Sequence, residues 1–496
     1  MKGENILIPS MHAVVVPFPA QGHVNALMHF AELLRARGFY ITFVNTEWTE
    51  KRILDSSKHF SERSNFRLLS FADGLPPEHG RTAQLGELVA MLAKRGPVLE
   101  EVLRSSNGNG VPPVTCILTD CIMSCTASVA ANMGVPRVVF WPLCAAASIA
   151  QKYADLLLSQ GHIPIKVSQT KRPEQMISGL PGNIPDLWPS DLISFYREQC
   201  ESDAIFKALL YEAQQSNEAD YVLINTFEEL EGRDAAAALS ANGCPSLAIG
   251  PVFLPKVLQG EETRLGSMWD EDESCLEWLD KQRPGSVLYV SFGSVAVKSQ
   301  QQLEELALGL EGSGQPFLWV LRSDIAEGHT PVLPEGFEKR TSDRAFIVNW
   351  TPQLKVLAHA SVGGFLTHNG WNSTLESISM GVPLLGWPYF GDQFLTCRFA
   401  KDIWKVGLDF KDVDVDDNRL VTREEVESAV RDLMQNEQLR KRALELKEAA
   451  IKAVMPGGSS FTNISTFIRD MLEKAKIPSS SFVQGGNDEG NILLVK

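Results

Sequence analysis

Two ionisable residues in the N-terminal part of the chain, His23 and Asp120, have the types and positions needed to move a proton. His23 stands between an apolar run at residues 12–18 and a segment with helical periodicity at residues 24–37. A helix N-terminus disfavours the imidazolium form, so a histidine at this point can stay neutral and act as a general base. Asp120 ends another apolar run, residues 114–119, and can direct its carboxylate into the same crevice. Each residue also has a structural interpretation, as a polar turn residue or a helix cap.

A second set of polar residues lies at residues 368–373, His-Asn-Gly-Trp-Asn-Ser. A strand-like run at residues 362–367 leads into a turn at residues 368–370, and an amphipathic helix begins near Trp371 and closes at Gly381. The unpaired N–H groups and positive dipole end of such a helix bind phosphates, and Asn372 and Ser373 can add side-chain hydrogen bonds. The turn therefore predicts a phosphate site, although helix capping also explains both side chains.

Two further residues are open to both interpretations. Ser294 follows the apolar run at residues 287–292, so its hydroxyl can also reach a phosphate from a strand-to-helix turn. Glu376 lies three residues after Ser373, which is the spacing of a capping box. The residues alone leave open whether this carboxylate caps the helix or binds a ligand.

The elements that position these residues alternate between strand and helix in both halves of the chain. Buried-strand runs occur at residues 12–18, 39–45, 114–119 and 221–225, and again at 287–292, 316–321, 345–348 and 362–367. This alternation predicts an α/β fold of the doubly wound type in each half.

Changes in composition predict where the two halves are joined. We expect an N-terminal domain at residues 1–252 and a C-terminal domain at residues 274–477. The polar, acidic stretch between them, residues 253–273, is the expected linker. Residues 478–496 are rich in Ser, Gly and Asn and predict a disordered tail.

The 496 residues are 44% apolar, which is enough for large cores, and the net charge is −15. Such an acidic chain is a poor partner for nucleic acid or an anionic membrane, so N–H groups, hydroxyls and imidazole must hold any anionic ligand. The N-terminus lacks a signal-peptide core, and the longest apolar stretch, residues 138–150, is too short to span a bilayer. We therefore expect a cytoplasmic monomer in which the eight scattered cysteines form no disulfide framework.

Residues 350–393 contain W-x-P-Q, H-N-G-W-N-S-T-L-E-S, G-V-P, W-P and D-Q in that order. This block resembles, over its full length and without a gap, the signature of the plant family 1 UDP-dependent glycosyltransferases. The segment P-F-P-A-Q-G-H-V-N at residues 17–25 is similar to the N-terminal motif of the same family. The resemblance implies the GT-B fold, in which two Rossmann-like domains face a central cleft.

The resemblance also implies a role for each matching residue. His23 becomes the catalytic base, and Asp120 becomes the carboxylate that stabilises its protonated form. Trp350 is implied to stack on uracil, while Gln353 and Glu376 are implied to reach the ribose. The full implied donor-binding set is Ser294, Trp350, Gln353, His368, Trp371, Asn372, Ser373, Glu376, Asp392 and Gln393.

Within that set, His368 is implied to bind the diphosphate together with Asn372 and Ser373. Asp392 and Gln393 are implied to bind hydroxyls of the sugar. Outside this family, the histidine would be an ordinary turn residue and the Asp-Gln pair an ordinary helix cap.

The chain departs from the family pattern at two positions. Ala26 stands where many members have proline, which softens the helix start but removes no reacting group. Pro142 stands where many members carry a Thr or Ser whose hydroxyl contacts the donor sugar. Gln393 is usual for glucose donors, so UDP-glucose is the expected co-substrate, and Pro142 leaves a different donor sugar open.

The acceptor is the part of the reaction that the sequence describes least. Phe18, Trp188 and Phe206 are candidate walls of its pocket, although core packing explains any single aromatic residue as well. Flavonoid, phenolic, terpenoid and steroid hydroxyls all remain open, as does attack by carbon or nitrogen.

The expected reaction is an inverting displacement at the anomeric carbon of the sugar, without a cofactor or a metal. Asp412-x-Asp414-x-Asp416 resembles the metal-binding D-x-D of the other main glycosyltransferase fold, but its acidic surroundings are typical of a solvated loop. Alternatives from other classes are a donor-only epimerase and a non-catalytic sugar-nucleotide-binding protein. A dinucleotide-dependent oxidoreductase is a further alternative, but the first turn lacks G-x-G-x-x-G.

Overall fold

Two parallel β-sheets form the framework of the protein, one from each half of the chain. The computed structural model describes residues 11–56, 64–81, 84–106, 108, 110–166, 176–197, 204–240, 243–261, 267–296, 298–326, 330–411 and 419–475. The Asp412-x-Asp414-x-Asp416 motif and the tail predicted at residues 478–496 lie outside the described residues. No helix in those ranges is both long and apolar enough to cross a membrane.

The N-terminal sheet has seven strands in the order β3-β2-β1-β4-β5-β6-β7. Its strands are β1 (His12–Val16), β2 (Tyr40–Thr46), β3 (Phe66–Phe71), β4 (Cys116–Asp120), β5 (Arg137–Trp141), β6 (Tyr221–Ile224) and β7 (Ser246–Ala248). In β1, Ala13 and Val15 pack into one hydrophobic core, while Val14 and Val16 pack into another. Because the strand is buried on both faces, its sequence is a continuous apolar run rather than an alternating one.

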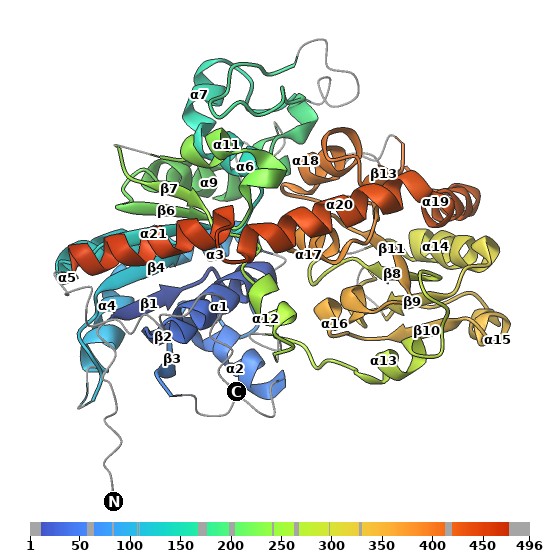
Figure 1. The fold of residues 1–496 in the computed structure, drawn as a ribbon, viewed down its shortest axis with the longest axis horizontal. Helices are drawn as coiled ribbons and strands as arrows, with labels where there is room; N and C mark the ends of the chain where they lie inside the picture. The colour runs from blue at the N-terminus through green and yellow to red at the C-terminus, as the bar shows by residue number, and fades with distance from the viewer. Residues whose placement is uncertain are drawn as a thin grey trace, which may run out of the picture.

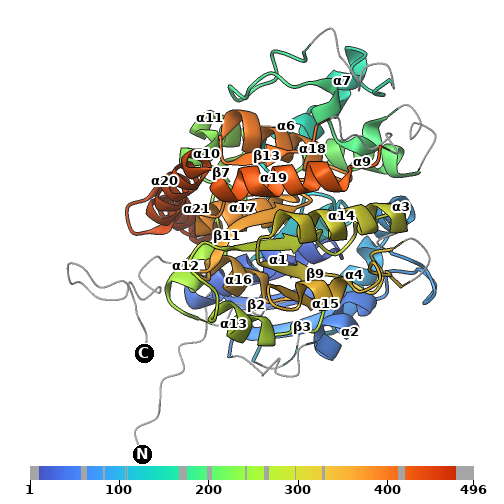
Figure 2. The same cartoon turned by 90° about the vertical axis from the view of Figure 1, so that its right-hand side faces the viewer.

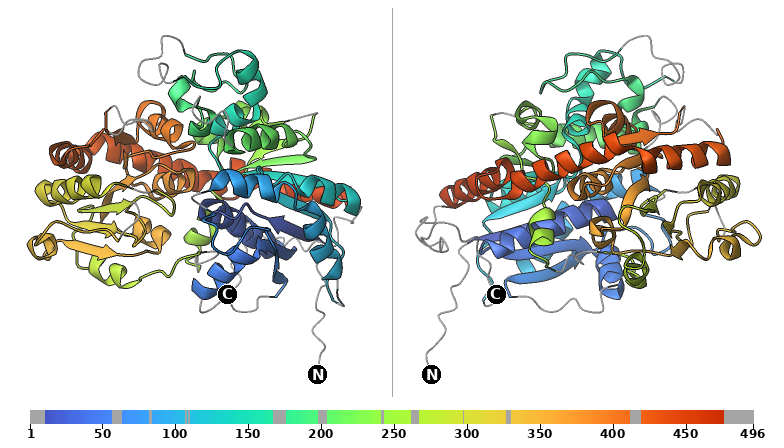
Figure 3. Two further views of the ribbon diagram at one scale, coloured as in Figure 1. Left: turned by 180° about the vertical axis from the view of Figure 1, so that it is seen from behind. Right: turned by 45° about the vertical axis from the view of Figure 1, so that its right-hand side comes forward.

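Helices cover both faces of this sheet, as the views from opposite sides show (Figure 1, Figure 3). The long ones are α1 (Gln21–Ala36), α2 (Glu47–Ser56), α3 (Leu85–Leu92), α4 (Gly96–Ser105), α5 (Thr126–Met133), α6 (Ala145–Lys152) and α9 (Ala204–Gln215). The short ones are α7 (Ala154–Ser159), η1 (Pro189–Asp191), η2 (Ser194–Tyr196), α10 (Glu228–Glu231), α11 (Arg233–Ala237) and α12 (Leu254–Leu258). The last of these lies inside the predicted linker.

The C-terminal sheet has six strands in the order β10-β9-β8-β11-β12-β13. Its strands are β8 (Val287–Ser291), β9 (Phe317–Val320), β10 (Ala345–Val348), β11 (Val362–Thr367), β12 (Leu384–Gly386) and β13 (Gly407–Asp409). The helices are α13 (Ser274–Leu279), α14 (Gln300–Ser313), α15 (Phe337–Thr341), α16 (Gln353–Ala358), α17 (Trp371–Met380), α18 (Gln393–Arg398), the π-helical η4 (Phe399–Ile403), α19 (Arg423–Gln435), α20 (Glu437–Val454) and α21 (Ser459–Lys474). Figure 2 looks onto this domain, with α14 and α19 packed side by side.

The strand order explains where a ligand site can form. In each sheet the order reverses once, between β1 and β4 in the first and between β8 and β11 in the second. Ligands of open α/β sheets bind at the carboxyl ends of the strands at such a reversal. The predicted doubly wound architecture is confirmed in both halves, and α1 begins at Gln21, so His23 lies in its first turn.

The C-terminal helix α21 returns to the N-terminal domain. Figures 1 and 3 show α20 and α21 running across both domains. Phe467 of α21 is fully buried against Phe30 and Tyr221, with ring centroids 6.2 and 5.2 Å away. The Tyr221 hydroxyl donates to Asp470 of the same helix at 3.2 Å. This helix falls inside the range expected for the C-terminal domain, 274–477, but by its packing it belongs to the N-terminal one.

Phe467→Ala tests whether α21 is part of the N-terminal core. Removing a fully buried phenylalanine from a packed core costs roughly 3–5 kcal/mol of the free energy of unfolding. Thr462→Ala, on an exposed position of the same helix, is the matched control and is expected to change stability by less than about 0.5 kcal/mol. Urea denaturation followed by tryptophan fluorescence measures both. Equal stabilities for the two variants would contradict the packing.

Candidate active site

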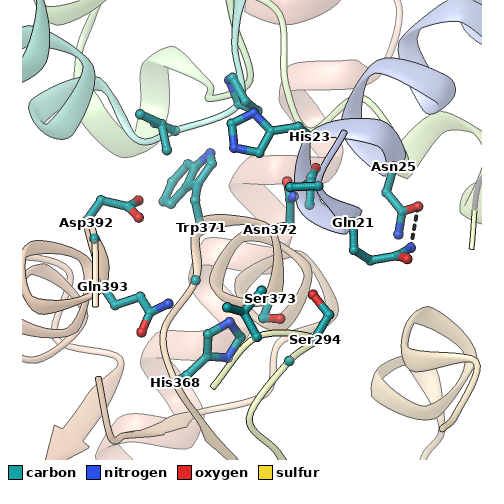
Figure 4. A pocket seen from close by; sticks show the side chains of 18 of the residues that line it. Gln21, His23, Asn25, Ser294, His368, Trp371, Asn372, Ser373, Asp392 and Gln393 are labelled. Atoms are coloured by element: carbon teal, nitrogen blue, oxygen red, sulfur yellow. Dashed lines mark hydrogen bonds between the residues drawn. The ribbon is translucent and has the colours of Figure 1, made fainter. Parts of the chain in front are cut away.

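A cavity of about 320 Å³ lies between the carboxyl edges of the two sheets and is lined by residues of both domains. Figure 4 shows side chains from the two domains directed into it from opposite sides. His23 enters from the N-terminal domain, while His368, Asp392 and Gln393 enter from the C-terminal domain. The two sets of residues that the sequence singled out therefore meet in one space.

His23 and Asp120 form a hydrogen-bonded pair at the edge of this cavity. The distance from His23 Nδ1 to Asp120 Oδ2 is 2.7 Å, and the backbone N–H of Ile122 donates to the other carboxylate oxygen at 3.2 Å. The aspartate side chain is fully buried, whereas 22% of the histidine side chain is exposed. Because a carboxylate only accepts hydrogen bonds, Nδ1 carries the proton and Nε2 is the basic nitrogen. The ring of Phe18 packs edge-on against the imidazole, 5.2 Å between centroids.

The surroundings of His23 set its proton affinity. Burial lowers the pKa of the imidazole, and the charge and hydrogen bond of Asp120, helped by the charge of Asp392, raise it. The net result is a pKa above the ordinary value of 6.5. This raised pKa strengthens His23 as a base and, because a base must be neutral, predicts loss of its function as pH falls.

The first turn of α17 faces His23 from the other domain. The helix begins at Trp371 with Gly370 as its N-cap, and no side chain caps it. The amide of Asn372 donates to the backbone carbonyl of Gly22 at 2.6 Å, and the Trp371 indole N–H donates to that of Asn225 at 2.8 Å. Both side chains therefore tie the domains together, and the helix-capping interpretation of Asn372 and Ser373 is not observed.

His368 lies at the base of this turn and is held in its neutral form. Burial, together with the positive charges of Arg322 and Lys298, lowers its pKa to about 3. Gly293 has a positive φ of 69°, and a Cβ at this position would lie 2.6 Å from the imidazole ring. Only glycine therefore allows the turn after β8, which carries Ser294, to approach the histidine so closely.

The two cations behind His368 do not line the cavity themselves. Arg322 donates to the backbone carbonyls of Gly293 and, at 3.1 Å, Ala296. The Lys298 ammonium lies 4.5 Å from the centroid of the Trp387 ring, and burial lowers its pKa to about 7. Among the described lining residues there is neither lysine nor arginine, as the acidic composition led us to expect.

Gln353 and Glu376 form a hydrogen-bonded pair at the cavity. The Gln353 amide donates to Glu376 at 2.7 Å and to the hydroxyl of Ser373 at 3.0 Å. Burial raises the pKa of Glu376 to about 7, against the effect of the Gln353 hydrogen bond and with that of the Glu271 charge. The predicted alternative, a Ser373–Glu376 capping box, is not formed, because Ser373 lies inside the helix.

Asp392 and Gln393 present opposite hydrogen-bonding capacities to the cavity. The Gln393 side-chain oxygen accepts from the backbone N–H groups of Tyr389 and Phe390 at 2.8 and 3.0 Å, which leaves its NH₂ group as the donor. The Oδ2 atom of Asp392 is buried without a hydrogen-bond partner among the described residues. Burial raises the pKa of Asp392 to about 6, and nearby His23 opposes this rise.

Trp350 lines the cavity and is supported by an aromatic residue of the predicted linker. Its ring stacks on that of Trp269 with 5.3 Å between centroids and 19° between planes. The Arg322 guanidinium lies 5.9 Å from the Trp269 ring. The linker thus contributes to the site through packing, which its polar, acidic composition did not indicate.

Comparison with known proteins supports the family resemblance. The family model described as UDP-glucoronosyl and UDP-glucosyl transferase matches residues 270–452, and the model for the glycosyltransferase N-terminal domain matches residues 10–73. The chain is 40% identical over 480 residues to 7-deoxyloganetin glucosyltransferase of Gardenia jasminoides, covering 93% of this chain and 98% of that protein. It is 37% identical to linamarin synthase 1 of Manihot esculenta, covering 93% and 97%.

The chain belongs to the plant UDP-dependent glycosyltransferase family. The structure of Medicago truncatula UGT71G1 complexed with UDP-glucose superposes with a TM-score of 0.78 at 26% identity, covering 93% of this chain and 98% of that one. The GT-B fold is therefore confirmed, and the protein is a UDP-glycosyltransferase.

Not every residue predicted for the acceptor pocket of the glycosyltransferase reaches the cavity. Phe18 lines it, but Trp188 and Phe206 are absent from the described lining residues. Phe206 instead packs in the core against Tyr196, 5.6 Å between centroids. Side chains that the sequence did not single out line it as well, among them Leu85, Val89, Ile122, Gln151, Ile193, Phe195, Ile205 and Leu209. They come from several separate elements, so no local sequence pattern joins them.

The pKa of His23 tests whether Asp120 is coupled to it in the glycosyltransferase. We expect the His23 imidazole to titrate above pH 6.5 and, in Asp120→Asn, at a lower pH, because the amide removes the negative charge. Asp392→Asn is expected to lower the midpoint less, because Asp392 acts on His23 through charge alone. NMR titration of isotope-labelled histidine, assigned with His23→Gln, measures all three. Identical midpoints in wild type and Asp120→Asn would rule out the coupling.

Proposed function

We propose that the enzyme is an inverting glucosyltransferase that moves glucose from UDP-glucose to a hydroxyl of a small lipophilic acceptor. The observation that carries the proposal is the 2.7 Å hydrogen bond between His23 and Asp120 at a cavity whose opposite wall is the first turn of α17. The names of the relatives, 7-deoxyloganetin glucosyltransferase and linamarin synthase, support transfer to small plant metabolites. Flavonoid, phenolic, terpenoid and steroid hydroxyls are the acceptor classes to be tested.

In this reaction His23 acts as the general base. Its Nε2 removes the proton of the acceptor hydroxyl, and the oxygen forms a bond to the anomeric carbon. The bond from that carbon to the diphosphate oxygen breaks on the opposite face, so the configuration inverts and UDP leaves with the electron pair. Asp120 holds the ring and stabilises the imidazolium that forms, in the manner of a base and its orienting carboxylate.

The C-terminal domain stabilises the departing diphosphate without a cation at the cavity surface. Backbone N–H groups of the first turn of α17, the neutral imidazole of His368 and the hydroxyls of Ser294 and Ser373 supply hydrogen-bond donors. Lys298 and Arg322 add positive potential from behind His368. Asn372 contributes to the same turn while it bonds to Gly22.

The remaining donor residues fit the other parts of UDP-glucose. Trp350 stacks on the uracil, and Gln353 with Glu376 binds the ribose hydroxyls. Asp392 accepts hydrogen bonds from sugar hydroxyls and Gln393 donates to them, so the two residues together use the hydroxyls as donors and as acceptors. Trp371 packs beneath the sugar while its indole N–H bonds to the N-terminal domain.

His23→Ala tests the base. We expect it to lower kcat for an aliphatic alcohol acceptor by on the order of 10²–10⁴ while UDP affinity stays nearly unchanged, because the nucleotide is held by the other domain. Asp120→Asn should cost less, and the two losses should not add, because both residues serve one proton transfer. Initial rates and calorimetric titration with UDP measure these effects, with His162→Ala, outside the cavity lining, as control. Near wild-type turnover of such an alcohol by His23→Ala would refute the mechanism.

The donor sugar is tested by competition. UDP-glucose is expected to give a higher kcat/KM than UDP-galactose, UDP-xylose or UDP-glucuronate. Gln393→Glu keeps an oxygen for the N–H groups of Tyr389 and Phe390 but removes the donor, so KM for UDP-glucose should rise by about tenfold or more. Mass-resolved product analysis measures the preference. A higher kcat/KM for another sugar would show that the glucose assignment is wrong.

A further inference from the structure

Gln151 lines the cavity from α6, and only 3% of the residue is exposed. Its side-chain amide makes no hydrogen bond to another described residue, so within the described structure its polar atoms are left to the cavity. An ordinary core would place an apolar side chain here, so the amide points to a ligand group that bonds to it.

The other amide side chains of the cavity are already engaged. Gln21 bonds to Asn25 at 2.8 Å and to the backbone N–H of Met268 at 2.9 Å. The remaining lining amides also have partners within the protein, namely Gln353, Asn372 and Gln393. Among the described lining amides, Gln151 is therefore the one whose side chain makes no hydrogen bond to a described residue, so both its oxygen and its NH₂ group are left for a ligand.

The wall around Gln151 belongs to the acceptor side of the cavity and is apolar. Helix α6 packs against α9, whose Ile205 and Leu209 line the cavity. The same side is completed by Leu85, Val89, Ile122, Leu143, Ile193 and Phe195. An amide in such a wall is satisfied well by one ligand group and poorly by bulk water, so it discriminates between acceptors.

Charge narrows the identity of that ligand group. The described residues that line the cavity include no lysine and no arginine, while Asp392, Glu271 and Glu376 do line it. A carboxylate on the acceptor would lie in this cavity without a counter-ion and near existing acidic groups, which is unfavourable. The group that meets Gln151 is therefore uncharged.

The topology gives the approximate separation between Gln151 and the base. Strand β5, which leads into α6, lies two strands from β1, which leads into α1, and neighbouring strands are about 4.8 Å apart. Gln151 is also well along α6 from its N-cap Cys144, at about 1.5 Å of rise per residue. The amide and His23 are therefore separated by on the order of 10 Å or more.

We infer that Gln151 determines acceptor specificity by bonding to a second, uncharged polar group, a carbonyl or a hydroxyl, at the end of the acceptor remote from the attacked hydroxyl. The inference rests on the proposed glucosyl transfer and narrows its acceptor class. The acceptor is an elongated neutral molecule with an apolar body and a polar group at each end. One end meets His23, and the other meets Gln151.

The test uses matched acceptors that differ only at the remote end. A homologous series of ω-hydroxy methyl ketones is compared with primary alkanols of the same chain length, with UDP-glucose as donor. At the chain length that spans the pocket, the wild type is expected to show a higher kcat/KM for the ketone than for the alkanol. Gln151→Leu should lower kcat/KM for that ketone roughly three- to tenfold and leave the alkanol unchanged or improved. Gln151→Met, which keeps the length of the side chain, should behave in the same way.

Gln160→Leu makes the same chemical change at an exposed position after α7 and should leave the ketone preference intact. Calorimetric titration with UDP reports whether each variant is folded, since the nucleotide half of the site lies in the other domain. The inference would be overturned if the preference for the ketone survived both Gln151 substitutions. It would also be overturned if the wild type preferred the ketone at no chain length. If no alcohol of either series accepts glucose although UDP binds, the proposed function has failed instead.

Discussion

The position of the two domains relative to each other is the constraint on which the site depends. Two hydrogen bonds from the first turn of α17, by Trp371 and Asn372, reach backbone carbonyls of Asn225 and Gly22 in the N-terminal domain. Gly22 immediately precedes His23, so the same turn that faces the cavity also fixes the start of the helix that carries the base. Because backbone carbonyls accept these bonds, the spacing between base and donor turn is independent of any flexible side chain on the N-terminal side.

The electrostatics of the cavity follow from the absence of lysine and arginine from its described lining. Burial, helped by the charges of Arg322 and Lys298, lowers the pKa of His368, so the imidazole is neutral and can donate one hydrogen bond without carrying a charge. Lys298 is itself surrounded by the rings of Phe292, Trp387 and Tyr389, which stabilise the ammonium in the absence of an ion pair with any described acidic residue. The positive charges of Lys298 and Arg322 therefore lie in the protein interior, and the group between them and the cavity is the neutral imidazole of His368.

The sequence predicted the fold, and the polar donor-site residues that it singled out line one cavity, because both depend on local patterns. The run at 362–367 became β11 with the same bounds, and α17 begins at Trp371 as expected. Packing between distant segments could not be predicted in the same way. Phe206 was a candidate for the pocket wall, but it packs in the core. Sequence alone does not separate the two positions, because an aromatic ring is equally suited to a pocket wall and to a hydrophobic core. The packing of α21 against the sheet of the other domain is likewise a contact between distant segments, which no local pattern indicates.

In the proposed reaction, three titratable groups of the site must lose a proton. His23 must do so to act as the base, and its pKa lies above 6.5. Asp392 and Glu376, with pKa values raised by burial to about 6 and 7, must also lose a proton before they can accept from hydroxyls as carboxylates. Rising pH therefore favours all three groups.

Lys298 responds in the opposite direction. Burial lowers its pKa to about 7, so the charge behind His368 is lost from the free enzyme as pH rises through that value. In the proposed donor complex, a diphosphate bound at His368 would favour the ammonium form and raise the pKa of Lys298. The proposed donor would thereby retain the positive potential that helps to bind it, at the pH values at which His23 is neutral.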